Sequence, residues 1–309
     1  MQPLRVMKSR CRNGLGLFSR PSTVVKQFRG HGTTNNPTNP HPSPQTSIDA
    51  TEITHFDALA STWWDPSGSS RLLHLMNPLR HDFISSCLAS HGQQEPPNGS
   101  LSYLDIGCGG GIFAESAARL PSTECVTALD PSASVITVAR AHAKKDPTLH
   151  LPAQQEANHA KRPAAKLTYL NTGIEDFSPS PPHEKYDVVT LFEVVEHVTH
   201  PATFLSSCLP LVKPGGWLVL STIARTWTSW LTTKVVAEDV IGLVPKGTHD
   251  WAKYVQEQEL RAWFAQREEW TSTMRSQGVI YVPGLGWQTV TGGEQWGNYF
   301  FGARRREQS

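Results

Sequence analysis

Cysteine is scarce in this 309-residue chain. Its five cysteines are scattered and form no Cys-x-x-Cys pair, which argues against a disulfide framework or a paired-cysteine zinc site. No apolar run approaches the roughly 18 residues that a transmembrane helix needs. Excess charge is also absent, because 28 Lys and Arg against 27 Asp and Glu leave a net charge of +1. We therefore expect neither a membrane-spanning protein nor a nucleic-acid binder.

Acidic residues are missing from the N-terminal stretch, where the first one is Asp49. Basic residues recur there between Arg5 and Arg29 and alternate with serine, threonine and apolar positions. This composition is typical of a mitochondrial transit peptide, and the alternative is a basic tail that binds anionic surfaces. Residues 31–47 have the composition of a linker. We expect a leader and linker over 1–47 and a folded domain over 48–306.

Expected strands alternate with expected helices along the domain, which predicts an α/β fold with a mainly parallel sheet. The apolar patterns place strands at 102–106, 125–129, 167–171, 186–192 and 217–221. They place helices at 51–64, 72–90, 112–120, 132–144 and 202–211. A Lys-Pro-Gly-Gly turn over 213–216 should precede the last strand, and the polar stretch 146–166 is expected to be a surface insertion.

A glycine-rich segment, Asp105-Ile-Gly-Cys-Gly-Gly-Gly111, follows the first expected strand and precedes a helix. Such a turn brings a ligand close to the backbone, although an ordinary tight turn would explain it too. Ile112 occupies the place of the third glycine of a dinucleotide fold, and Asp130 ends the second strand, where a carboxylate accepts bonds from ribose hydroxyls. The combination resembles the nucleoside site of class I S-adenosylmethionine-dependent methyltransferases.

Several strings resemble one family, the ubiquinone biosynthesis O-methyltransferases of bacteria and mitochondria. The more particular ones are Trp63-Trp64-Asp65, Asn77-Pro-Leu-Arg80, Glu193-Val-Val-Glu-His197 and Val244-Pro-Lys-Gly-Thr-His-Asp250. The resemblance implies a Rossmann-like sheet with an antiparallel edge hairpin strand, helices on both faces, a helical cap over 48–100 and a lid over 223–260. It also implies methylation of ring hydroxyls of a polyprenyl-dihydroxybenzoate and of demethylubiquinol.

The donor implied by the resemblance is S-adenosylmethionine, and the residues that match the family's donor-binding positions are Arg80, Gly107, Asp130 and Phe192. A guanidinium at residue 80 suits the donor's carboxylate. The resemblance further implies a peripheral location on the matrix side of the mitochondrial inner membrane, with other ubiquinone-synthesis proteins as partners.

Glu193, Glu196 and His197 follow the fourth strand at spacing i, i+3, i+4, which places them on one face of a helical turn. They are the expected catalytic residues, since a ring hydroxyl needs a general base or a metal to lose its proton. Two carboxylates and an imidazole suit Mg²⁺ or Zn²⁺. The alternative is that Glu196 and His197 form a local hydrogen-bonded pair.

The segment 226–244 is apolar apart from Lys234, Glu238 and Asp239, and it predicts either a helical flap at the membrane interface or a buried cap helix. Two other functions stay open. The protein could methylate another small aromatic or a protein, or it could be a non-catalytic scaffold in a ubiquinone-synthesis complex.

Overall fold

The computed structural model describes residues 47, 50–90, 100–149, 165–180, 184–224, 255–270 and 273–307. Its α-helices are α1 (Ala50–Leu59), α2 (Arg71–Ala89), α3 (Ile112–Ala118), α4 (Ala133–Ala143), α5 (Pro201–Cys208) and α7 (Glu257–Ala265). Its strands are β1 (Leu101–Ile106), β2 (Thr123–Asp130), β3 (Lys166–Asn171), β4 (Tyr186–Phe192), β5 (Val212–Ile223), β6 (Thr273–Val282), β7 (Gly286–Val290) and β8 (Asn298–Arg304). Short 3₁₀ helices include η1 (Ala60–Thr62) and η4 (Val195–His197).

The strands form one sheet in the order β3-β2-β1-β4-β5-β8-β6-β7. The first five strands are parallel, and β8 pairs with β5 in the antiparallel sense. β6 and β7 then extend the sheet as an antiparallel hairpin beyond β8. The class I methyltransferase fold is thus confirmed, with a more extensive antiparallel edge than the single strand expected.

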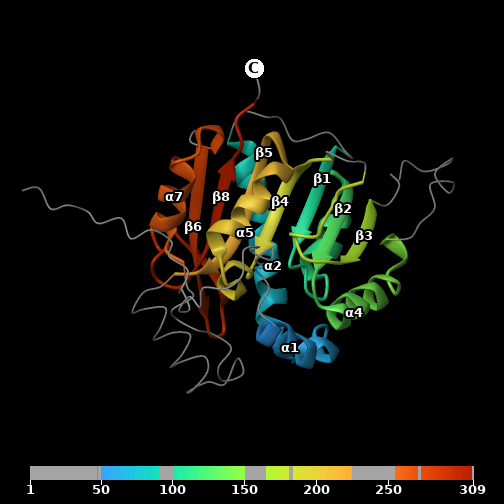
Figure 1. Ribbon diagram of the computed structural model, residues 1–309. Coiled ribbons are helices and arrows are strands. Elements are labelled where there is room, and N and C mark those ends of the chain that lie inside the picture. Colours follow the sequence, from blue (N-terminus) through green and yellow to red (C-terminus); the bar gives the residue numbers. More distant parts are fainter. Residues whose placement is uncertain are drawn as a thin grey trace, which may run out of the picture.

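Helices cover both faces of the sheet (Figure 1). They can pack on both faces because apolar side chains alternate between the two faces along the central strands. Tyr103, Val188 and Trp217 point to one face, where they pack with residues of α2, α3 and α4. Their neighbours in the chain, including Leu104 and Val189, point to the other face and pack with α5 and α7. Both faces are apolar because successive side chains of a strand point in opposite directions.

The Lys-Pro-Gly-Gly segment does not form the turn that the sequence predicts. It lies inside β5, where the pairing with β4 shifts register between Tyr186 and Val188. Arg305, which follows β8, explains the difference, because the Gly215 N–H donates to the Arg305 carbonyl and the Arg305 N–H donates to the Gly216 carbonyl. These bonds tie the segment to the sheet at the irregularity, where Gly215 takes a positive φ of 81°.

Several expectations lie outside the described residues: the leader, most of the 146–166 insertion, the apolar segment 226–244 and the string 244–250. Of the expected lid over 223–260, the described ends belong to β5 and to the start of α7. Among the helices described, none is long and apolar enough to cross a membrane.

Candidate active site

A cavity of about 400 Å³ lies at the carboxyl ends of the parallel strands, under α1 and the N-terminal part of α2. Carboxyl ends of strands in an open α/β sheet are where such folds bind ligands. Six of the seven predicted site residues line this cavity: Gly107, Asp130, Phe192, Glu193, Glu196 and His197. The seventh, Arg80, is not in the lining and lies behind Phe192, with its guanidinium carbon 4.8 Å from the centre of that ring.

The glycine turn is explained by packing as much as by ligand access. Gly107, Gly109 and Gly111 have positive φ values of 70°, 52° and 89°. A Cβ at Gly109 would lie 2.3 Å from the Trp63 ring, and one at Gly110 would meet the same ring at 2.3 Å. The two middle glycines therefore make room for a tryptophan of the N-terminal region, a role that the sequence pattern did not indicate.

Asp130 ends β2 beside this turn. Its carboxylate accepts hydrogen bonds from the backbone N–H groups of Gly109, at 3.0 Å, and Ser132, at 2.9 Å. Burial raises the pKa of Asp130 to about 6, against the effect of these two bonds. The side chain thus fixes the turn and the start of α4 while it lines the cavity.

Arg80 and Asp105 are buried polar groups whose bonding capacity is not filled by the described chain. Arg80 is 4% exposed and its Nε has no acceptor among the described residues. Asp105 is 2% exposed; Oδ1 accepts from the Thr190 hydroxyl at 2.7 Å, while Oδ2 has no partner in the described structure. Burial lowers the pKa of Arg80 and raises that of Asp105 to about 7. Such groups are rare in folded proteins and usually await a ligand or water.

The prediction that Glu193, Glu196 and His197 share one face of a helical turn is wrong. Glu193 precedes η4 and has a left-handed φ of 56°, which turns its carboxylate to the Ser221 hydroxyl at 2.6 Å. Glu196 accepts from the Thr222 hydroxyl at 2.8 Å, and His197 Nδ1 lies 3.0 Å from Glu52. Burial, aided by the charge of Glu193, raises the pKa of Glu196 to about 7.

These three side chains are of the types that bind Mg²⁺ or Zn²⁺, but as placed they do not fit a metal ion. Each is directed to a different hydrogen-bond partner, and within the described ranges no three His, Cys, Asp or Glu side chains gather into a metal-binding group. We therefore derive no step through a metal.

Sequence reasoning missed Glu52, which lies in the first turn of α1 and reaches His197 across 145 positions of the chain. Because a carboxylate only accepts, the Nδ1 of His197 carries the hydrogen of this bond. Burial disfavours the charged imidazole, but the bond to Glu52 and the charges of Glu196, Glu52 and Glu193 outweigh it and raise the pKa of His197. No local signal in the sequence could have paired these residues.

The end of the cavity farther from Asp130 along its lining is apolar and aromatic. It is formed by the β6–β7–β8 region, which the sheet order separates from β2, with Val279, Tyr281, Trp287 and Trp296, and by Met76 of α2. Trp287 Nε1 donates to the carbonyl of Leu72 at 2.9 Å, which joins the hairpin to α2. This wall was also absent from the predicted site, because the hairpin residues carry no motif.

Comparisons with known proteins agree with this architecture. Residues 64–272 match a family model described as a methyltransferase domain. The solved plantazolicin methyltransferase BpumL in complex with SAH shares the fold, with a TM-score of 0.50 and 18% identity over 83% of this chain and 97% of its own. Sheet order, glycine turn and family model together define a class I S-adenosylmethionine-dependent methyltransferase.

Two curated relatives narrow the class. The mitochondrial ubiquinone biosynthesis O-methyltransferase of Candida albicans is 36% identical over 299 residues, covering 84% of this chain and 86% of its own. Its counterpart in Schizosaccharomyces pombe is 41% identical over 237 residues, covering 77% of each chain. The chain belongs to the ubiquinone biosynthesis O-methyltransferase family.

Proposed function

We propose that this protein transfers the methyl group of S-adenosylmethionine to ring hydroxyls of aromatic ubiquinone precursors. One observation carries the proposal: a single cavity runs from the glycine turn and Asp130, past His197, to an aromatic wall that includes Trp287. Donor, base and acceptor surfaces are therefore continuous. The same continuity argues against a non-catalytic scaffold, which would need no base between the two ends.

At the donor end, Asp130 accepts bonds from the ribose hydroxyls, and Phe192 packs beside the adenine. Arg80 and Asp105 suit the two charges of the donor's amino acid part, the guanidinium for the carboxylate and the carboxylate for the ammonium group. Their unfilled bonding capacity supports this assignment, since a zwitterion would satisfy both. Neither side chain lines the cavity, and Arg80 lies against the Phe192 ring, so the assignment requires that ring to move when the donor binds.

His197 is the general base of the proposed reaction. With Nδ1 bonded to Glu52, its Nε2 has a free lone pair that accepts the proton of the acceptor hydroxyl. The resulting oxygen attacks the sulfonium methyl carbon, the C–S electrons return to sulfur, and S-adenosylhomocysteine leaves. Glu193 and Glu196 stabilise the imidazolium that forms, because both charges raise the pKa of His197. The proton then passes from His197 to solvent.

The acceptors are a polyprenyl-dihydroxybenzoate and demethylubiquinol, bound with the ring against the wall of Tyr281 and Trp287. Because a polyprenyl chain resides in the bilayer, we place the enzyme peripherally on the matrix side of the mitochondrial inner membrane, beside other ubiquinone-synthesis proteins. The two fungal relatives are mitochondrial enzymes.

Turnover of a short-chain demethylubiquinol with methyl-labelled donor tests the proposal directly. We expect labelled ubiquinol from the wild type and at least a hundredfold lower rate from His197→Ala, in line with the contribution of a general base. Donor binding without turnover of demethylubiquinol, while another small catechol is methylated, would favour the alternative acceptor class. Failure to bind the donor at all would favour the scaffold.

A further inference from the structure

The side of the glycine turn away from the site described above is held by a polar and aromatic network that the proposed reaction does not use. Its centre is Trp64, in the chain between η1 and α2, whose indole Nε1 donates to the carbonyl of Gly110 at 2.8 Å. The neighbouring Trp63 covers the same peptide, in the space that side chains at Gly109 and Gly110 would occupy. The two tryptophans thus fix the most flexible part of the turn.

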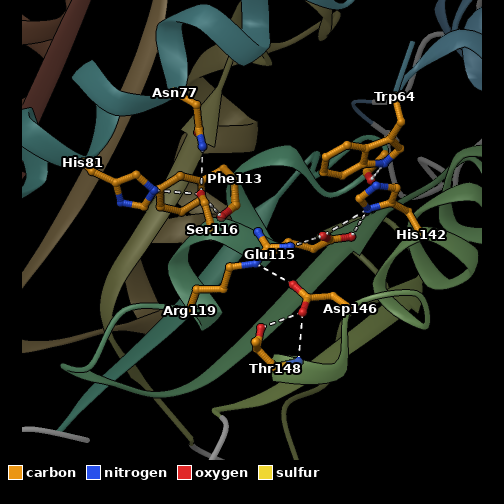
Figure 2. Close-up of polar contacts among 11 residues, drawn as sticks. Trp64, Asn77, His81, Phe113, Glu115, Ser116, Arg119, His142, Asp146 and Thr148 are labelled. Atoms are coloured by element: carbon orange, nitrogen blue, oxygen red, sulfur yellow. Dashed lines mark hydrogen bonds and ion pairs between the residues drawn. The ribbon is translucent and has the colours of Figure 1, made fainter. Parts of the chain in front are cut away.

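The orientation of Trp64 is itself fixed from α4. Its ring stacks on His142, with centroids 3.4 Å apart and planes inclined by 4°. His142 Nδ1 lies 2.9 Å from Oε1 and 3.1 Å from Oε2 of Glu115 (Figure 2). Because the Glu115 carboxylate only accepts, it holds the imidazole in one orientation.

Glu115 anchors the network in the helix that follows the turn. Its side chain is fully buried in the first turn of α3, whose N-cap residue is Gly111. Arg119 balances its charge through a bond of 2.8 Å and is held in turn by Asp146, at 2.7 Å (Figure 2). The path from Gly110 through Trp64, His142 and Glu115 therefore ends in the first turn of the helix that follows Gly111.

We propose that Trp64 is a positioning residue for the methyl donor, acting through Gly110, with His142 and Glu115 holding its ring in place. Four glycines between positions 107 and 111 leave the turn much conformational freedom in the unfolded chain and little intrinsic rigidity when folded. An anchor that orders the turn before the donor arrives removes that ordering cost from binding. The role rests on the proposed function, because it assumes that the turn binds S-adenosylmethionine.

The test measures the dissociation constant of S-adenosylmethionine by calorimetry for Trp64→Phe, which keeps a ring beside His142 and removes the N–H. Loss of one neutral hydrogen bond predicts weaker binding by about twofold to tenfold. The rate at saturating donor should stay near the wild-type value, since no reacting group changes. Tyr299→Phe is the matched control, because it removes a neutral hydrogen bond from an aromatic side chain to a backbone carbonyl, that of Val255 at 2.9 Å, outside the cavity lining and away from the turn.

We expect both variants to lose similar thermal stability in the absence of donor, but only Trp64→Phe to lose donor affinity. Equal affinity in Trp64→Phe and wild type, or an equal loss in Tyr299→Phe, would overturn the inference. A second pair guards against misfolding: His142→Ala should weaken donor binding and His142→Phe, which restores a stacking ring, should recover most of it. A wild type that binds no S-adenosylmethionine would instead refute the proposed function.

Discussion

Replacing Glu52 by glutamine tests whether Glu52 orients His197 as the base, because the His197 side chain itself stays in place. Glu52 meets His197 Nδ1 at 3.0 Å, and the amide keeps the shape of the carboxylate while losing its charge. The amide can also donate to Nδ1, which moves the imidazole hydrogen to Nε2 and abolishes the base. We therefore expect a lower turnover number with little change in donor affinity.

The magnitude follows from the exposure of the pair. A hydrogen bond to a charged group contributes about 1.5–3 kcal/mol, or roughly tenfold to a hundredfold in rate. The two side chains are 16% and 22% exposed, so solvent screens part of the interaction and the lower end applies. We expect a loss of about tenfold in kcat, measured at saturating donor with a short-chain demethylubiquinol.

The pH profile supplies the decisive readout. His197 must be neutral to act as base, and its pKa is raised, so wild-type activity should be lost on acidification through a midpoint above its ordinary value of 6.5. Glu52→Gln removes a contribution that raises this pKa, and the acid limb should move to lower pH. The control is Asp57→Asn, on the same helix, which removes a carboxylate charge but keeps an oxygen that accepts from the Ser132 hydroxyl. An unchanged kcat and an unshifted acid limb in Glu52→Gln would refute the role of His197.

Three further predictions concern the donor site. Asp130→Asn should weaken donor binding about tenfold to a hundredfold, as measured by calorimetry. Because burial raises the pKa of Asp130 to about 6, the donor affinity of the wild type should fall as the pH drops through about 6. The variant should lack this pH dependence. Arg80→Met should keep or raise the melting temperature in the absence of donor, because it removes a buried charge that has no ion pair among the described residues. The same variant should lose the rise in melting temperature that the donor produces in the wild type. A rise equal to that of the wild type would contradict the assignment of Arg80 to the donor. Chelation should leave donor affinity unchanged, whereas turnover lost with chelator and restored by Mg²⁺ would show that Glu193, Glu196 and His197 rearrange into a ligand set.

The sequence by itself determines the strands and turns whose signals lie within a few neighbouring residues. The strand at 186–192 is mostly apolar and rich in β-branched residues, and it forms with the expected bounds because a strand buried on both faces is recognised from its own composition. The glycine turn and Asp130 are also local signals, since each follows directly from where a strand ends. The resemblance to the family predicted the donor-binding residues without any knowledge of their contacts.

Tertiary structure decided everything that depends on distance along the chain. The Lys-Pro-Gly-Gly segment became part of a strand because Arg305 pairs with it. Glu193 does not lie on the expected helical face, because its own left-handed backbone conformation directs its carboxylate to the Ser221 hydroxyl. Glu52 reached His197 only when α1 folded over the strand ends. A periodic pattern records which face a side chain takes, but not which distant group meets it, and hydrogen bonds between remote residues leave no such pattern in the sequence.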